Sequence, residues 1–297
     1  MIRMQIKVNE SGKRIDVFLL DEISLSRNQI QKAIKNKQVL VNGDEVKTNY
    51  VVKENDIIDF NYVEDPIEVK PKKMELDIVY EDDDVMVINK KNGVVVHPGN
   101  GNYTDTLVNG LMYYTDNLSE SSFRPGIVHR IDAYTTGLIM IAKNSYAHDF
   151  LAEQLKNKTV TRKYIALVWG VINNDTGTID APIGRNKKDR KKMAVTDENS
   201  KKAVTNFRVL ERYKKATLIE LKLETGRTHQ IRVHMEYINH PVVNDPVYGN
   251  KKIINDFGQC LHAKELGFIH PTTKEYMHFD SELPSEFVDI INMFKEE

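Results

Sequence analysis

One stretch of the sequence places charged and hydroxyl side chains directly before a run of apolar ones. Residues 124–144 read RPGIVHRIDAYTTGLIMIAKN, a polar loop followed at once by the strand-like LIMIA. This order delivers polar groups to the edge of a core, where the carboxylate of Asp132 is expected to be partly desolvated. Burial alone raises the pKa of an aspartate by as much as about 3 to 5 units, so an ionised Asp132 needs a cation beside it. Such a carboxylate suits a base or a nucleophile.

The candidate cation lies in residues 223–235, LETGRTHQIRVHM. A strand is expected to end at Gly226, and a helix carrying Arg232 to begin directly after it. Backbone N–H groups at the start of a helix suit an anion such as phosphate. The side chains expected there are Arg227, Thr228 and His229. Two structural interpretations stay open, Thr228 as an ordinary N-cap and His229 as a surface residue.

The first part of the chain predicts two short helices and a small hairpin sheet. Apolar residues at helical spacing follow Gly12 in RIDVFLLDEI, and Ser26 stands where an N-cap would start a second helix, RNQIQKAIKNK. The pair Asn42-Gly43 predicts a tight hairpin turn, and the β-type run NDIIDFNYV closes the module. The basic side chains of the second helix lie largely off its apolar stripe, namely Arg27, Lys32, Lys35 and Lys37.

These patterns divide the chain into two domains. We expect the small module to span residues 12–63, an extended linker with two prolines to span 64–74, and a larger domain to span 75–297. The larger domain is rich in strands, with clear helical spacing only in SYAHDFLAEQLKN and THQIRVHMEYIN. Strands that follow strands predict an α+β fold, in which helices flank a mixed, mostly antiparallel sheet.

Composition limits the classes of protein that fit. The 297 residues are 40% hydrophobic and 29% charged, and no apolar run approaches the roughly 20 residues that span a bilayer. We therefore expect no membrane partner and a cytoplasmic location. A single cysteine, Cys260, allows no internal disulfide and no thiolate metal cage. The net charge of −1 does not suggest nucleic acid, but residues 185–192, RNKKDRKK, form a basic block that either collects phosphates or is a solvated loop.

Two families resemble this chain, one over each domain. The patterns R-x-D, S-R-x-x-I-x-x-x-I and V-x-V-N-G between Arg14 and Asp59 resemble the S-four-type, or α-L, RNA-binding module. The blocks HRIDAYTTGL, RKYIALV, TGRTHQIRVH and LHAKELGFIHP resemble the RluA-type pseudouridine synthases, and the combination is similar to the RluD branch. The resemblance covers nearly the whole chain. It implies that the basic helix with Arg27, Lys32 and Lys35 follows RNA phosphates.

The resemblance also assigns roles in catalysis. Asp132 is implied to be the essential carboxylate that acts on a flipped uridine, and Arg232 to pair with it. Tyr164 is implied to stack on the target base and to assist a late proton removal, with Ile231 packed against it. Arg130 corresponds to the residue that enters the RNA stack as the base leaves. The same motifs bring further residues to the substrate, namely His129, Thr135, Arg227, Thr228 and His229.

The implied reaction is simple in its requirements. It cuts the bond from ribose to a ring nitrogen, turns the base and rejoins it through a ring carbon, so it needs no cofactor and no metal. Whether the carboxylate attacks the sugar, attacks the base or removes a sugar proton stays open. By resemblance, the partner is RNA of the large ribosomal subunit or an assembling large subunit, and we expect a monomer. The loop NKKNG departs from the family's N-K-P-A-G at Lys91 and Asn92.

Three other interpretations compete. HRID superficially resembles the HRD loop of protein kinases, but no Gly-rich loop, DFG or APE accompanies it. A metal enzyme could use His229, His234 and His240, although their spacing matches no zinc motif. An inactive RNA-binding assembly factor with the same fold is the third. Under that reading Asp132 and Arg232 would be a structural ion pair.

Overall fold

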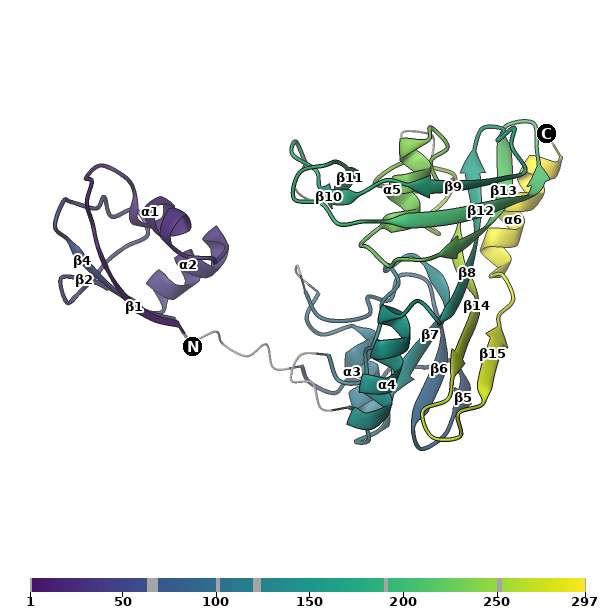
Figure 1. The fold of residues 1–297 in the computed structure, drawn as a ribbon, viewed down its shortest axis with the longest axis horizontal. Coiled ribbons are helices and arrows are strands. Elements are labelled where there is room, and N and C mark those ends of the chain that lie inside the picture. The colour runs from purple at the N-terminus through teal and green to yellow at the C-terminus, as the bar shows by residue number, and fades with distance from the viewer. Residues whose placement is uncertain are drawn as a thin grey trace. The chain divides into compact units, whose positions relative to one another are not determined.

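The computed structural model describes residues 2–62, 69–99, 102–119, 124–189, 192–249 and 253–296. The chain forms two compact units, Met1–Pro66 and Ile67–Glu297, and each has its own hydrophobic core (Figure 1). The expected linker 64–74 lies partly outside the described residues, at 64–68.

Unit 1 packs two helices against a small antiparallel sheet with strand order β1-β4-β2-β3. Its elements are β1 Ile2–Lys7, α1 Ile15–Glu22, α2 Arg27–Lys35, β2 Val39–Val41, β3 Asp44–Glu45 and β4 Ile57–Tyr62. Ser26 caps α2 through a reciprocal exchange of hydrogen bonds with Gln29. Asn42 and Gly43 both have positive φ, as the predicted tight turn requires. Strand β1 was not predicted, although Ile2, Met4 and Ile6 alternate with polar residues along it.

Asp16 is one of two buried carboxylates among the described residues of unit 1. Its carboxylate is closed to solvent and accepts hydrogen bonds from Arg14 at 3.0 Å, from Arg27 at 2.9 Å and from Gln31 at 2.7 Å. Because α1 carries Asp16 and α2 carries Arg27 and Gln31, these bonds join the two helices. Arg27, one of the basic residues predicted to follow phosphates, therefore has a structural partner as well.

In the described part of unit 2, nine strands form one mixed sheet with the order β5-β6-β7-β14-β8-β13-β12-β9, and β15 pairs with β14. All neighbours are antiparallel except β7 and β14, which run parallel. The predicted mixed, mostly antiparallel sheet is confirmed. The strands are β5 Ile78–Glu81, β6 Val85–Lys90, β7 Thr136–Ala142, β8 Thr161–Trp169, β9 Thr176–Asp180, β12 Val204–Arg212, β13 Ala216–Leu223, β14 Leu261–Ile269 and β15 Tyr276–Asp280.

The parallel contact between β7 and β14 is short. Its register consists of two residue pairs, Thr136 with His262 and Gly137 with Ala263. Gly137 has a φ of +103°, and a Cβ there would lie 2.3 Å from the carbonyl oxygen of Ala263. Only glycine fits this approach, so the glycine after HRIDAYTT is set by the meeting of two backbones.

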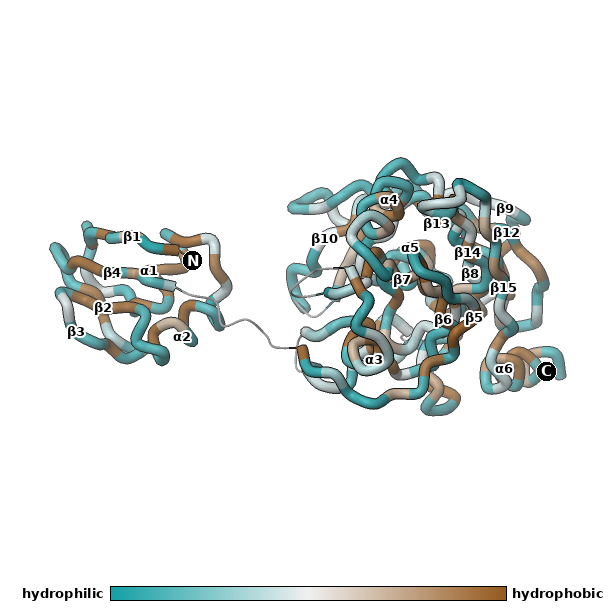
Figure 2. Tube along the Cα trace, turned by 90° about the horizontal axis from the view of Figure 1, so that it is seen from below, coloured by the Kyte–Doolittle hydropathy of each residue, from teal (hydrophilic) through white to brown (hydrophobic). Residues whose placement is uncertain are grey.

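Four helices and a hairpin complete the described part of unit 2. They are α3 Leu107–Tyr114, α4 Ser145–Lys156, α5 Gln230–Tyr237, α6 Ser285–Lys295 and the strands β10 Ile183–Arg185 and β11 Met193–Val195. The prediction for α4 is confirmed, whereas α5 begins at Gln230 rather than directly after Gly226. Helix α6 carries both apolar and polar residues (Figure 2). Its apolar residues at helical spacing are buried, namely Phe287, Ile290, Ile291 and Phe294. No helix among the described residues is long and apolar enough to cross a bilayer.

Candidate active site

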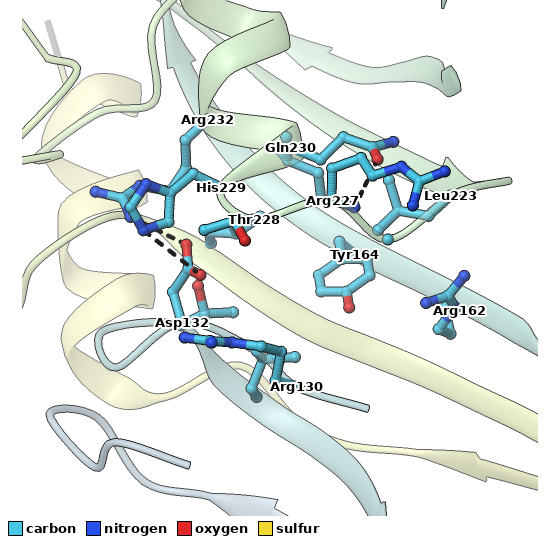
Figure 3. Close-up of a pocket in the computed structure, with 15 residues that line it drawn as sticks. Arg130, Asp132, Arg162, Tyr164, Leu223, Arg227, Thr228, His229, Gln230 and Arg232 are labelled. Carbon is cyan, nitrogen blue, oxygen red and sulfur yellow. Dashed lines mark hydrogen bonds and ion pairs between the residues drawn. The ribbon is translucent and has the colours of Figure 1, made fainter. Parts of the chain in front are cut away.

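Asp132 lines a cavity of about 80 Å³ between the loop before β7, strand β8 and the connection from β13 to α5 (Figure 3). Since one water needs about 10 to 15 Å³, the cavity has room for about five to eight waters. Most of the residues singled out from the sequence meet here, although some, such as Asp132 and Arg232, are 100 positions apart. They are Arg130, Asp132, Thr135, Tyr164, Arg227, Thr228, His229, Ile231 and Arg232.

The predicted pairing of Arg232 with Asp132 is present. Nη1 of Arg232 donates to Oδ2 of Asp132 at 3.0 Å. The rest of the guanidinium is held by Asp245, because Nε donates to Oδ2 at 2.7 Å and Nη2 to Oδ1 at 2.9 Å. Asp245 is closed to solvent and also accepts the backbone N–H groups of Val247 and Tyr248. This two-point contact fixes the plane of the guanidinium, so Asp132 meets a cation of fixed direction.

The charges of this group support one another. Burial opposes the charge of Arg232, but the carboxylates of Asp245 and Asp132 outweigh it and hold the pKa of Arg232 above its ordinary value. Burial likewise opposes the charge of Asp245, but the guanidinium and two backbone N–H groups hold the pKa of Asp245 below its ordinary value. A cation therefore stands beside Asp132 at every pH at which the protein is folded.

Lys90 supports the turn that carries Asp132. It ends β6, is only 2% exposed, and its Nζ donates to the backbone oxygens of Lys91 at 3.0 Å and Ala133 at 2.8 Å. Burial lowers the pKa of Lys90 to about 7, while the charge of Asp132 opposes the decrease. Sequence reasoning missed this residue, although it belongs to the NKKNG loop that was singled out.

Tyr164 and Arg162 leave β8 on the same side, two residues apart, and both line the cavity (Figure 3). Tyr164 is buried, and burial raises the pKa of its hydroxyl group. It belongs to the same apolar cluster as Ile231, which the sequence placed beside it. The guanidinium of Arg162 lies against the backbone of Gly226, where a Cβ would come within 2.9 Å of Nη1. Its Nε is buried and has no partner among the described residues.

His229 occupies the position before α5 with a left-handed φ of 55°. Arg227 and Thr228 therefore lie in a preceding turn and not in the first turn of the helix, and the interpretation of Thr228 as N-cap is wrong. His229 is not a surface residue either, since its side chain is 22% exposed. Its Nδ1 lies 2.8 Å from the hydroxyl group of Tyr248, and its Nε2 lies 4.0 Å from Oδ1 of Asp132.

Three predicted residues of the HRIDAYTTG loop have structural partners. His129 does not line the cavity. Its Nε2 accepts the backbone N–H of Met140 at 3.1 Å, and burial lowers the pKa of His129 to about 3. Thr135 accepts a hydrogen bond from Gln259 at 3.2 Å. Arg130 lies at the cavity, with its Nη1 at 3.4 Å from Nε2 of His97.

A second hollow of about 500 Å³ adjoins the cavity. The two share Arg130, Arg162, Gly226 and Arg227 in their walls. The second hollow is also lined by Arg124 from the loop before β7 and by Lys156 and Lys158 at the end of α4, with Glu224 as its single acidic residue. Its surface is therefore strongly basic, unlike the chain as a whole.

Some predicted residues lie apart from the cavity. Lys32 and Lys35 are exposed in the last turn of α2 in unit 1. In the basic block, 190–191 lie outside the described residues, while the block's two ends belong to β10 and to the approach to β11. His234 and His240 are held by other groups, Thr205 and two backbone oxygens. Among the described residues no three His, Cys, Asp or Glu side chains gather as a metal would require.

Comparison with known proteins agrees with this geometry. Residues 84–237 match the RNA pseudouridylate synthase family, and residues 13–58 match the S4 domain. The uncharacterized RNA pseudouridine synthase YlyB of Bacillus subtilis is 52% identical over 98% of both chains. The chain belongs to the RNA pseudouridine synthase family. As a synthase of this family it is an isomerase, so the kinase interpretation is wrong.

Further relatives of this synthase show how widely the fold is shared. The ribosomal large subunit pseudouridine synthase D of Neisseria meningitidis serogroup B is 40% identical, with 99% of this chain and 82% of the relative covered. The solved structure of human RNA pseudouridylate synthase domain containing 1 is 30% identical, with a TM-score of 0.59 over 75% of this chain and 87% of the human one. The synthase fold of unit 2 is therefore common to bacterial and human proteins.

Proposed function

We propose that this synthase converts specific uridines of large-subunit ribosomal RNA to pseudouridine, with Asp132 as the catalytic carboxylate. One observation carries the assignment. The Asp132 carboxylate lines a cavity and is paired at 3.0 Å with a guanidinium that Asp245 holds from behind. A carboxylate that only stabilised the fold would not need to face an open cavity.

The reaction divides into bond breaking, rotation and bond formation. The bond from C1′ to N1 breaks with its electron pair left on the base, the base turns, and a bond from C1′ to C5 forms. The C5 proton then leaves and N1 takes up a proton. Asp132 acts at the ribose or the base as a nucleophile or a proton acceptor. Tyr164 stacks on the base, and its position opposite Asp132 across the cavity suits late proton removal (Figure 3).

The size of the cavity suits one pyrimidine that has left its helix. The cavity has room for several waters and is open on one side, which leaves space for a planar pyrimidine ring. Unstacking a base costs a few kcal/mol, and stacking on an aromatic side chain returns about 1 to 3 kcal/mol. Arg130 at the cavity edge could fill the gap that the base leaves in the RNA stack.

RNA as the substrate is supported by charge and by relatives. The basic hollow beside the cavity suits the phosphates that flank a flipped nucleotide. In unit 1, the exposed Lys32 and Lys35 of the S4 domain suit further phosphates. A relative that is 40% identical is named as a large-subunit enzyme, which is why we propose that RNA.

We extend the proposal to a monomeric enzyme of the cytoplasm. Residues of this chain bring Asp132, Arg232 and Tyr164 together at one cavity, which suits a monomer. A reducing compartment suits the buried free thiol of Cys260.

The proposal is tested by mapping pseudouridines across total RNA from cells with the protein, without it, and with the variant Asp132→Asn. We expect sites that disappear without the protein and are not restored by the variant, because an amide is neither a base nor a nucleophile. Purified Asp132→Asn should still bind the RNA. Restoration of the sites by Asp132→Asn would contradict the assignment.

An inactive assembly factor with the same fold is the alternative. It predicts that no pseudouridine depends on this protein while large-subunit assembly does. The same mapping separates the two proposals, since only a synthase changes the modification pattern.

A further inference from the structure

Tyr248 contacts His229 on the side away from the cavity, and the mechanism above gives it no role. Its ring is fully buried, and the guanidinium of Arg232 lies 4.9 Å from the ring centroid. Its hydroxyl oxygen accepts the backbone N–H of Met193 at 2.9 Å and lies 2.8 Å from Nδ1 of His229. A buried hydroxyl group therefore contacts His229, the histidine that lines the cavity beside Asp132.

Counting hydrogens decides how His229 is protonated. A phenol has one hydrogen to donate, and the N–H of Met193 already uses the oxygen as an acceptor. Among the described residues, the other partner of this hydroxyl group is Nδ1 of His229. If Nδ1 also carried a hydrogen, the Tyr248 hydrogen would be buried without an acceptor, which folded proteins avoid. Tyr248 therefore donates to Nδ1, and the hydrogen of a neutral His229 is on Nε2.

The Nε2–H group of His229 faces the cavity. Nε2 lies 4.0 Å from Oδ1 of Asp132, which is too far for a hydrogen bond, and His229 lines the cavity beside that carboxylate (Figure 3). Burial lowers the pKa of His229, although the charge of Asp132 opposes the decrease, so the imidazole is mostly neutral near pH 7. It therefore presents a fixed N–H donor, and none of the described residues offers it an acceptor within hydrogen-bond distance.

We propose that His229 donates this hydrogen to an oxygen of the flipped uridine, and that Tyr248 is the positioning residue that keeps the hydrogen on Nε2. The inference rests on the proposed function. When the bond from C1′ to N1 breaks, the electron pair left on the base spreads negative charge onto the uracil oxygens. A donor that is already oriented stabilises this charge as it develops, without any reorganisation.

Tyr248→Phe tests the positioning role, because it keeps the buried ring and removes only the hydroxyl group. We expect kcat to fall about ten- to hundredfold with KM nearly unchanged, as for other groups that orient a reacting residue. In ¹⁵N-histidine NMR spectra the wild-type His229 should carry hydrogen on Nε2. In the variant it should become a mixture of tautomers with a raised pKa, since the neutral form has lost a hydrogen bond.

Tyr213→Phe is the matched control. Tyr213 is also buried, and its hydroxyl group donates to Glu211 at 2.8 Å, but it does not line the cavity. The control should keep both kcat and the His229 spectrum of the wild type. A wild-type His229 with hydrogen on Nδ1 would overturn the proposal, and so would a Tyr248→Phe enzyme with full kcat.

Substitutions of His229 test the donor itself. Glutamine can place an amide N–H near the position of Nε2, whereas alanine cannot. We expect His229→Ala to lower kcat about a hundredfold, as loss of one such donor does, and His229→Gln to recover at least a tenth of the wild-type kcat. Equal activity of the wild type and His229→Ala would overturn the proposal.

The outcomes separate this inference from the proposed function. If the wild type forms no pseudouridine in any RNA, both are overturned. If the wild type is active, Asp132→Asn is inactive, and Tyr248→Phe and His229→Ala are fully active, only the inference is overturned and Asp132 keeps its role.

Discussion

At the scale of single residues, the site depends on a carboxylate that does not face the substrate. Asp245 holds two nitrogens of Arg232 and leaves the third, Nη1, for Asp132. A lysine has the same charge, but its three N–H donors all leave one nitrogen and cannot match bonds made from three separate nitrogens in one plane. The geometry of the arginine fork, and not only its charge, therefore orients the carboxylate that we propose to be catalytic.

Arg232→Lys tests this dependence. We expect the variant to fold, because the positive charge between two carboxylates remains, and to lose activity by about a hundredfold or more, because Asp132 is no longer oriented. The measurement is release of tritium from RNA labelled at C5 of uridine. Arg212→Lys is the control, since Arg212 also makes several bonds, to Asp175 and two backbone oxygens, away from the cavity. Unimpaired tritium release by Arg232→Lys would refute the argument.

The sequence predicted the pairing of Asp132 with Arg232 but not the residues behind it. Both are found in motifs where polar groups adjoin apolar runs, which is a local pattern. Asp245, Tyr248 and Lys90 act through contacts made across the fold, and nothing in their local sequence distinguishes them from loop residues. Their burial, which gives them their importance, is a property of the three-dimensional structure.

At the scale of elements, local signals were reliable where a local cause produces the structure. The N-cap at Ser26 and the turn at Asn42-Gly43 fold as predicted, because each depends on neighbouring residues. The start of α5 was placed too early. The side chain of Gln230 accepts the N–H of Arg227 and the hydroxyl group of Thr225, so these residues form a separate turn. The sequence THQIRVH does not reveal this competing arrangement.

The end of α4 gives the element-scale prediction. Lys156 and Lys158 line the basic hollow, and we expect Lys156→Gln with Lys158→Gln to weaken RNA binding and raise KM while leaving kcat nearly unchanged. Each contact to a single-strand phosphate adds about 0.7 to the slope of log K against log salt concentration, so the double variant should flatten that slope by up to about 1.4. Binding is measured as a function of salt.

Lys222→Gln is the control for this experiment. Lys222 is exposed and leaves β13 on the side opposite to Leu223, which lines the cavity. For Lys222→Gln, the slope of log K against log salt concentration should equal that of the wild type. A double variant with an unchanged slope would show that RNA does not pass through the basic hollow.

At the scale of the whole molecule, the sequence predicted two domains and a mixed sheet, but not the order of the strands. Two parallel pairs, at Thr136 and Gly137, join β7 to a strand about 125 residues later. Neither segment shows this partner in its own pattern, since any apolar strand could pair there. The contact depends on how all the strands close around one core.

Stability should fall in acid because buried histidines must be neutral. The pKa of His129 in the folded state, about 3, lies below the ordinary value of 6.5. The stability that the neutral side chain of His129 contributes is therefore complete above pH 6.5 and is lost as the pH falls towards 3. From pH 7 to pH 5, His129 alone should remove about 2 kcal/mol from the free energy of unfolding of unit 2. Urea unfolding at the two pH values measures this loss.

His129→Gln should show a pH-dependent loss that is smaller by about this amount, because glutamine does not titrate and can still accept the N–H of Met140. His278→Gln is the control, since the side chain of His278 is 45% exposed, and it should keep the wild-type loss. The explanation fails if His129→Gln responds to acid as the wild type does.

The short parallel contact between β7 and β14 at Gly137 has a consequence for the geometry of the site. On one side of this contact, the loop with Asp132 precedes β7. On the other side, β14 pairs with β8, the strand that carries Tyr164. A methyl group at position 137 would collide with the backbone of Ala263 and push β7 and β14 apart. We expect this to separate Asp132 from Tyr164, although the methyl group would contact neither. A genetic screen for inactive variants should therefore return substitutions of Gly137 as well as of Asp132. The first would displace parts of the site, and the second would remove the carboxylate that we propose to be catalytic.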